Sequence, residues 1–147
     1  MKKIAKYPAI ALAGFVIYTS IEMLWRGRTY AAMGAAGALS LIAIYRVRCA
    51  YDSFPVAVRC AVDAVLITLV EYSFGLVFNV ILRRGMWDYS NIPLNVYGQI
   101  CPLYIGLWYL LCIPGDRLCG ALSTFFGDGE SHLTEDISDE TNNPFSA

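Results

Sequence analysis

Two acidic residues in the apolar part of the sequence are the clearest candidates for chemistry. Glu71 lies in a long apolar run, twelve residues before Arg83, the next charged residue. A charged carboxylate at the centre of a membrane costs several kcal/mol unless it has a partner or meets water. Glu22 stands four residues before Arg26, so an ion pair across one helical turn would neutralise it. Carboxylates within membranes commonly bind protons or cations, and Glu71 is therefore the first candidate for such a site.

Polar and small residues accompany Glu71 at helical spacing. Four positions, each three or four residues from the next, share one face of a helix: Thr68, Glu71, Gly75 and Asn79. We expect this polar stripe to point into a helix bundle. Gly14 and Tyr18 continue the face of Glu22, so we expect that face to meet the stripe.

A second acid of the same run has a basic neighbour one helical turn earlier. Asp63 follows Arg59 by four residues, near one end of the expected span. Because opposite charges at this spacing can pair on a helix, we interpret the two residues as a structural ion pair.

The segment 83–101, RRGMWDYSNIPLNVYGQIC, gathers polar residues between two apolar runs. Trp87 and Tyr89 are typical of the headgroup level of a membrane, and Pro93 prevents a helix from running straight through. Three further residues can cap helix ends or close turns, a structural role that stands beside a binding role: Asp88, Ser90 and Asn91. We therefore expect a polar turn at the membrane surface.

Two amides follow this turn. Asn95 and Gln99 are four residues apart, and we expect them in the first turns of a fourth helix. Hydrogen bonds to neighbouring helices would be their structural role there.

The composition determines which elements must position these residues. The chain has 147 residues, of which 57% are hydrophobic, and a mean hydropathy of +0.51. A soluble domain of this size needs a more charged surface, so the solvent must be lipid. Four apolar stretches cover residues 8–25, 30–45, 57–82 and 94–113. Since about 20 helical residues span a bilayer, we predict an all-α integral membrane bundle of four transmembrane helices. The second stretch is rich in Gly and Ala, which favours close packing in the centre of the bundle.

Charge divides the chain into two parts. Residues 1–127 carry all eleven basic groups and six acids, whereas residues 128–147 carry six acids and no basic group. We predict a membrane domain over 1–127 and an acidic, disordered tail over 128–147. Pro114 and Gly115 should break the fourth helix, and residues 116–126 could then lie along the membrane surface. Seven basic residues on one side against four on the other place both termini in the cytoplasm.

The sequence lacks the motifs of several common kinds of enzyme and metal site. Its five cysteines form no C-x-x-C pair, and no glycine-rich phosphate loop, G-x-S-x-G or H-E-x-x-H motif is present. Nothing requires a metal or another cofactor, although two carboxylates with amide oxygens could hold a hard cation. We assign no catalytic residue and no metal ligand, and we expect no nucleic-acid partner.

The polar turn also carries a resemblance to a known family. Residues 87–90 (WDYS), Pro93, Asn95 and residues 98–101 (GQIC) resemble the signature of the bacterial family named putative ABC-transporter type IV, or CmpB-like. Residues 22–28, which contain Glu22 and the run WRGR, resemble its first block. The resemblance covers nearly all of residues 10–113, and residues 104–106 depart from the usual run. It implies a small multi-pass protein of the bacterial cytoplasmic membrane and, by family analogy, an ATPase subunit as a partner.

Three functional hypotheses follow. The first is a transporter or permease-like protein with a polar cavity, lined by Glu22, Arg26, Arg28, Glu71, Asn79, Trp87, Asp88, Tyr89, Ser90, Asn95 and Gln99. A bundle this small would form its pathway as a homo-oligomer. The second is a structural or holin-like interaction protein, whose polar residues only lock the helices together. The third is an intramembrane enzyme that acts on a lipid or its headgroup, which ranks lower because no nucleophile stands out.

Overall fold

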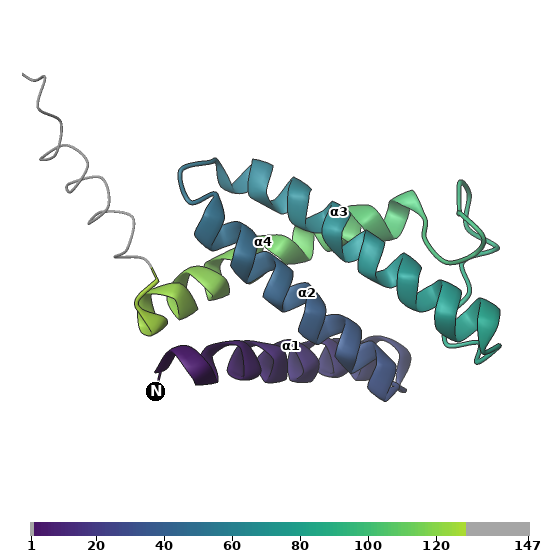
Figure 1. Ribbon diagram of the computed structural model, residues 1–147. Coiled ribbons are helices and arrows are strands. Elements are labelled where there is room, and N and C mark those ends of the chain that lie inside the picture. The colour runs from purple at the N-terminus through teal and green to yellow at the C-terminus, as the bar shows by residue number, and fades with distance from the viewer. Residues whose placement is uncertain (1, 129–147) are drawn as a thin grey trace, which may run out of the picture.

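The computed structural model describes residues 2–128 and has four long helices (Figure 1). The elements are α1 (Lys2–Arg26), α2 (Ala31–Ala50), α3 (Val56–Phe74), a π-helical continuation of α3 named η1 (Gly75–Ile81), and α4 (Pro102–Phe126). By length and composition, α1, α2, α3 with η1, and α4 can each cross a membrane. Residues 2–128 contain no strand, only an isolated antiparallel pair between Val96 and Ile100. The predicted all-α membrane bundle is confirmed.

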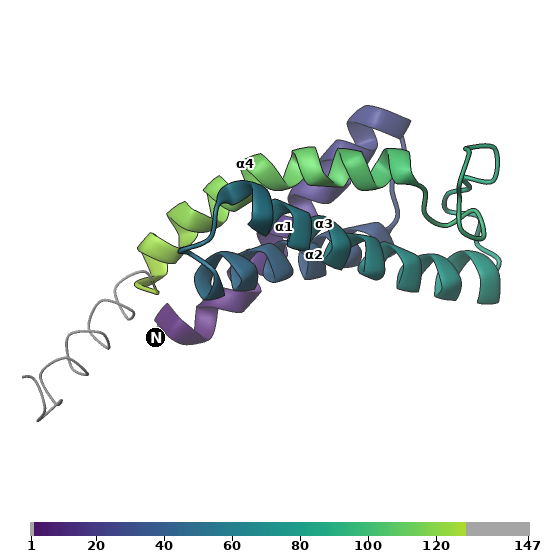
Figure 2. The ribbon, with the colours of Figure 1, turned by 90° about the horizontal axis from the view of Figure 1, so that it is seen from above.

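The start of α1 and the end of α4 lie at the same end of the bundle (Figures 1 and 2). The turn between α1 and α2 and the segment 82–101 lie at the opposite end, which we call the turn end. Helix α2 packs against α1, α3 and α4, whereas α1 has little contact with α4. Half of the most apolar part of α2 is buried, against 17–28% for the other three spans. The expected central place of the second span is therefore confirmed.

Glycines allow α1 and α2 to approach each other closely. A Cβ atom added to Gly37 would lie 2.2 Å from the Cβ atom of Tyr18, and one added to Gly14 would lie 2.5 Å from the Gly37 carbonyl oxygen. Gly34 similarly accommodates the ring of Phe15. Small residues thus set the distance between these two helices, as the Gly- and Ala-rich sequence predicts.

The fourth helix begins later than predicted. It starts at Pro102, whereas the apolar pattern placed its start at residue 94. Leu94, Tyr97 and Gly98 have positive φ angles of 59°, 52° and 68°, so residues 94–101 form turns and cannot continue a right-handed helix. The segment is apolar enough to resemble part of a span, but its backbone geometry is that of a turn.

The predicted helix break at Pro114 is wrong. Helix α4 continues through Pro114 to Phe126 and ends at Gly127, which has a left-handed φ of 78°. Proline is tolerated inside membrane helices because neighbouring groups compensate for the missing hydrogen bond, and Pro114 is exposed at the bundle surface. Gly115 faces Ile44 of α2, so a small residue here lets the helices pack. Residues 116–126 are consequently the last turns of α4.

Asp128, just after α4, connects the end of that helix to α1 and α2. Its carboxylate lies 2.6 Å from Nζ of Lys6 and accepts a hydrogen bond of 2.7 Å from the Tyr45 hydroxyl. This contact connects α1 and α2 with the end of α4. The rest of the predicted acidic tail, residues 129–147, lies outside the described residues.

Candidate functional site

The Glu71 carboxylate is buried and held by two neutral donors. Its residue is 3% exposed, and its two oxygens accept hydrogen bonds from the Tyr18 hydroxyl (3.1 Å) and the Trp108 indole N–H (2.6 Å). The Tyr18 and Trp108 rings stack with centroids 5.8 Å apart. Three helices, α1, α3 and α4, therefore meet at this carboxylate. Tyr18 does meet the polar stripe, as the sequence predicts, whereas Gly14 packs against α2.

Three of the four residues of the polar stripe are buried in the bundle, and the fourth, Asn79, is half-buried. Thr68 is buried and donates to the carbonyl of Ala64, one turn earlier on its own helix. Gly75 is also buried and begins the π-helical turns of η1, where an added Cβ would lie 2.6 Å from Oε1 of Gln99. π-Helical segments often occur at functional sites, and this one presents Asn79 to the segment that follows.

Asn79 connects η1 to the turn end. Its amide donates to the Trp87 carbonyl (3.0 Å) and to Oε1 of Gln99 (2.9 Å), and its oxygen accepts from the N–H of Met86 (2.7 Å). The Trp87 indole in turn donates to the Gln99 carbonyl (3.0 Å). These bonds hold the segment 82–101 against η1, so this segment covers the turn end of the bundle.

A cavity of about 260 Å³ lies between the helices, next to the Tyr18 and Trp108 rings. Its lining is almost entirely apolar and comes from α1, α2 and α4, together with Ile67 of α3. Tyr18 and Trp108 line it and also hydrogen-bond to Glu71, so they link the carboxylate to the cavity wall. Glu71 itself does not line it. The lining of this cavity suits apolar groups. It contains none of the residues that the sequence predicts around a polar cavity.

Glu22 and Arg26 form the predicted ion pair, with Nε of Arg26 3.6 Å from the carboxylate. Arg26 also donates to the Met86 carbonyl (3.2 Å) and the Tyr89 hydroxyl (3.4 Å), which joins α1 to the turn end. The Tyr89 ring is buried and stacks on Tyr104, with centroids 4.3 Å apart. Burial, the first cause, and the carboxylate of Glu71 raise the pKa of the Tyr89 hydroxyl, so it stays protonated.

The remaining polar residues of the turn bond mainly to one another. One oxygen of Asp88 accepts from the backbone N–H of Ser90 (2.8 Å) and from its hydroxyl, and these bonds lower the pKa of the Asp88 carboxyl. Asn95 donates to the carbonyls of Ser90 (3.1 Å) and Ile92 (2.8 Å) and accepts from the N–H of Gly98 (2.9 Å). Asp88, Ser90 and Asn95 therefore close the turn.

The expected helical positions of Asn95 and Gln99 are wrong. Both residues precede α4 and lie within the turn, because the positive φ angles of residues 94–98 redirect the chain. Gln99 nevertheless bridges elements, since it contacts Asn79 of η1.

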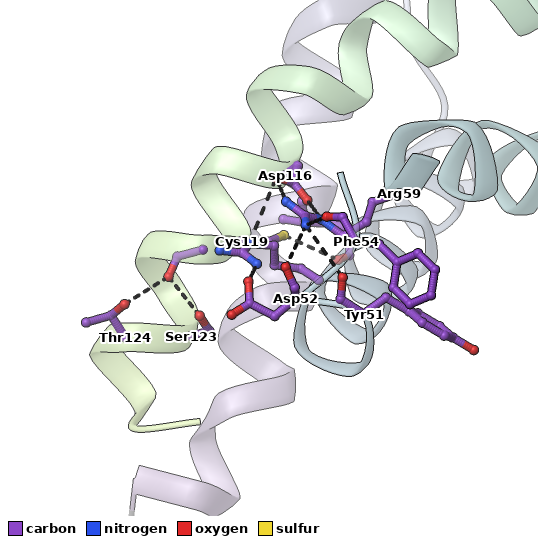
Figure 3. Close-up of polar contacts among 11 residues, drawn as sticks. Tyr51, Asp52, Phe54, Arg59, Asp116, Cys119, Ser123 and Thr124 are labelled. Atoms are coloured by element: carbon purple, nitrogen blue, oxygen red, sulfur yellow. Dashed lines mark hydrogen bonds and ion pairs between the residues drawn. The ribbon is translucent and has the colours of Figure 1, made fainter. Parts of the chain in front are cut away.

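The predicted pair between Asp63 and Arg59 does not form. Arg59 instead makes two bonds to Asp116 of α4, from Nε (2.7 Å) and from Nη2 (2.9 Å), and all these groups are buried (Figure 3). Its third nitrogen donates to carbonyls of the α2–α3 turn at Tyr51, Asp52 and Phe54. The planar guanidinium matches a carboxylate across the interface better than one on its own helix. Neither oxygen of Asp63 has a hydrogen-bond partner.

The sequence offered little signal for Asp116. It follows Pro114 and Gly115, so it was placed beyond the end of the fourth helix. Because α4 continues through Pro114, Asp116 comes to face α3 within the bundle. Because membrane helices tolerate proline, a helix that continues through Pro114 is the signal that would make Asp116 a candidate partner of Arg59.

The chain matches the family described as "Putative ABC-transporter type IV" over residues 16–119. It belongs to this family. The region shared with the ABC-transporter type IV family begins within α1, ends within α4 and contains Glu71 and the turn end. No curated protein and no solved structure matches the chain.

Within this family region, the predicted site residues fall into separate groups. Glu71 bonds to Tyr18 and Trp108, neither of which the sequence selected as part of the cavity with it. A second group joins η1 and α1 to the turn: Glu22, Arg26, Asn79, Trp87, Tyr89 and Gln99. A third closes the turn itself: Asp88, Ser90 and Asn95. Arg28 is exposed in the turn between α1 and α2.

Proposed function

We propose that this protein is a transport component of the bacterial cytoplasmic membrane, in which Glu71 binds a proton or a cation beside a solute cavity. The observation that supports this role is a carboxylate buried at mid-span with no basic side chain bonded to it. Burying an acid inside a membrane costs free energy, so a residue of this kind is a functional candidate by default. Membership of the transporter family supports the same role.

The environment of Glu71 suits reversible binding. Tyr18 and Trp108 stabilise an ionised carboxylate through their O–H and N–H groups, so the proton of Glu71 can leave and return. The adjoining apolar cavity would hold the apolar part of a solute. In this conformation, the bonds among Asn79, Trp87 and Gln99 close the turn end, so a solute would leave on that side only after these bonds open.

A transport role requires more than this single bundle. Four spans enclose only a small pathway, so we expect a homo-oligomer. An ATPase partner follows from the family description alone. If the protein instead serves only to organise other membrane proteins, the bonds of Glu71 contribute packing and nothing else.

Flux through liposomes distinguishes these roles. The purified protein is reconstituted, a pH gradient or a gradient of Na⁺ or K⁺ is imposed, and uptake is followed with a fluorescent indicator inside the vesicles. Replacing Glu71 with glutamine keeps an acceptor for Tyr18 or Trp108 but removes the ionisable group. We expect Glu71→Gln to lower the flux about tenfold or more, which corresponds to about 1.4 kcal/mol.

The matched control is Asp52→Asn, the same chemical change at an exposed position of the α2–α3 turn. It should leave the flux unchanged. Equal flux in wild type and Glu71→Gln, with both proteins folded by circular dichroism, would rule out Glu71 as the transport site.

A further inference from the structure

Asp63 is a buried acid that no contact in the structure explains. Its residue is 0% exposed, and neither carboxylate oxygen has a hydrogen-bond partner. An ionised carboxylate in such a place is strongly unfavourable, so the group must carry a proton or bind a cation. Residues 2–128 contain no group of three or more His, Cys, Asp and Glu side chains that could hold a metal ion. A proton is therefore the ligand that this position best accommodates.

The charged and titratable groups around Asp63 do not neutralise it. Arg59 is nearby, but its guanidinium is occupied by Asp116 and by the carbonyls of the α2–α3 turn. Asp116 adds like charge, and three thiols complete the titratable surroundings, one from α3 and two from α4: Cys60, Cys112 and Cys119. Since Arg59 and Asp116 form a neutral pair, the charge of Asp63 has no remaining counterion among these groups.

The position of Asp63 relates it to Glu71. Asp63, Ile67 and Glu71 are spaced by four residues and lie on one face of α3, which places the two acids about 12 Å apart along the helix axis. Ile67, midway between them, lines the cavity, as does Cys112 beside Asp63. The cavity therefore adjoins the stretch of α3 that separates the two carboxyl groups, but neither acid lines it and its apolar lining offers few partners to water, so the two acids are separate sites.

We propose that Asp63 is a second proton-binding site of this bundle, whose carboxyl group carries a proton at neutral pH. The proton removes the charge of a fully buried group whose oxygens have no hydrogen-bond partner, so the protonated form is the one that the surrounding helices tolerate. This protonation does not rest on the proposed function of Glu71.

Infrared spectroscopy of the reconstituted protein tests the protonation directly. A protonated carboxyl group has a C=O stretching band distinct from that of a carboxylate, and labelling aspartate with ¹³C at its carboxyl carbon shifts the bands of Asp63 but not those of Glu71. We expect wild type near pH 7 to show a label-sensitive band of a protonated aspartate that disappears in Asp63→Asn. The control Asp52→Asn should keep the band, because Asp52 is exposed. Absence of this band from wild type overturns the proposal.

The Glu71→Gln variant tests whether the two acids are separate sites. It should keep the label-sensitive band of Asp63, and loss of the band in this variant overturns the proposal of a second site. If Asp63→Asn fails to fold, Asp63→Glu still decides, since its protonated C=O band must lose the shift caused by aspartate labelling. If Glu71→Gln leaves flux unchanged while the Asp63 band is present, the transport role of Glu71 fails and the protonation of Asp63 stands.

Discussion

Three of the buried acids of this bundle, Asp116, Glu71 and Asp63, lie in different environments. Asp116 has a guanidinium at 2.7 Å, Glu71 has two neutral donors, and Asp63 has no hydrogen-bond partner. Asp116 is bonded to the Arg59 guanidinium, whereas Glu71 and Asp63 can change their protonation state without leaving a cation unpaired. The first acid is therefore structural, and the other two are the candidates for chemistry.

Breaking the pair of Arg59 and Asp116 should destabilise the bundle strongly. Arg59→Met leaves the Asp116 carboxylate buried without its main partner, because Arg48 lies 3.9 Å from it. We expect a loss of about 3–5 kcal/mol in the free energy of unfolding, measured by denaturant titration in detergent and circular dichroism.

A double variant separates charge from packing in this pair. Arg59→Met with Asp116→Leu should be more stable than Arg59→Met alone, because no charge is left unpaired. Arg46→Met, on an exposed arginine of α2, is the control and should have little effect. A double variant as unstable as the single one would contradict this explanation.

At the scale of the elements, glycines decide how closely α1 and α2 approach. Gly37 lies against Tyr18, whose hydroxyl bonds to Glu71, so the packing of these helices also positions the site. Helix α4 has no such neighbour at Gly106, where an added Cβ would meet no atom within 4 Å. The same substitution at the two positions therefore has different consequences.

Gly37→Ala should destabilise the protein, whereas Gly106→Ala should not. The new methyl group at residue 37 would overlap Tyr18 and the Gly14 carbonyl, and overpacking of this kind costs about 1–3 kcal/mol. At residue 106 alanine favours the helix by about 0.5–1 kcal/mol. Denaturant unfolding of both variants in the same detergent measures the difference, and equal stabilities would show that the α1–α2 contact is looser than the structure indicates.

At the scale of the whole molecule, the four spans return the chain to the side where it began (Figure 1). Basic residues are unevenly divided between the two ends. The end shared by the start of α1 and the end of α4 has seven, and the turn end has four: Arg26, Arg28, Arg83 and Arg84. Because basic residues concentrate on the cytoplasmic side, the turn end should face outward.

Labelling of intact cells tests this orientation. A cysteine introduced by Asn91→Cys, exposed at the turn end, should react with a membrane-impermeant maleimide. Wild-type protein should react little, since four of its five cysteines are buried and Cys49 is partly buried near the opposite end. A green fluorescent protein fused after Ala147 should fluoresce in the cytoplasm. Labelling of Asn91→Cys no stronger than that of wild type, or a dark fusion, would indicate the reverse orientation.

The sequence alone determined the membrane class, the four helices, the central second span and the inward direction of the stripe around Glu71. These properties follow from hydropathy and helical periodicity, which act within one segment. Only the tertiary structure decided that Arg59 pairs with Asp116, that α4 starts at Pro102 and passes through Pro114, and that Tyr18 and Trp108 bond to Glu71. These contacts join helices distant in the sequence or depend on turn geometry, so local patterns could not identify them. Asp63 was left without its expected partner for the same reason.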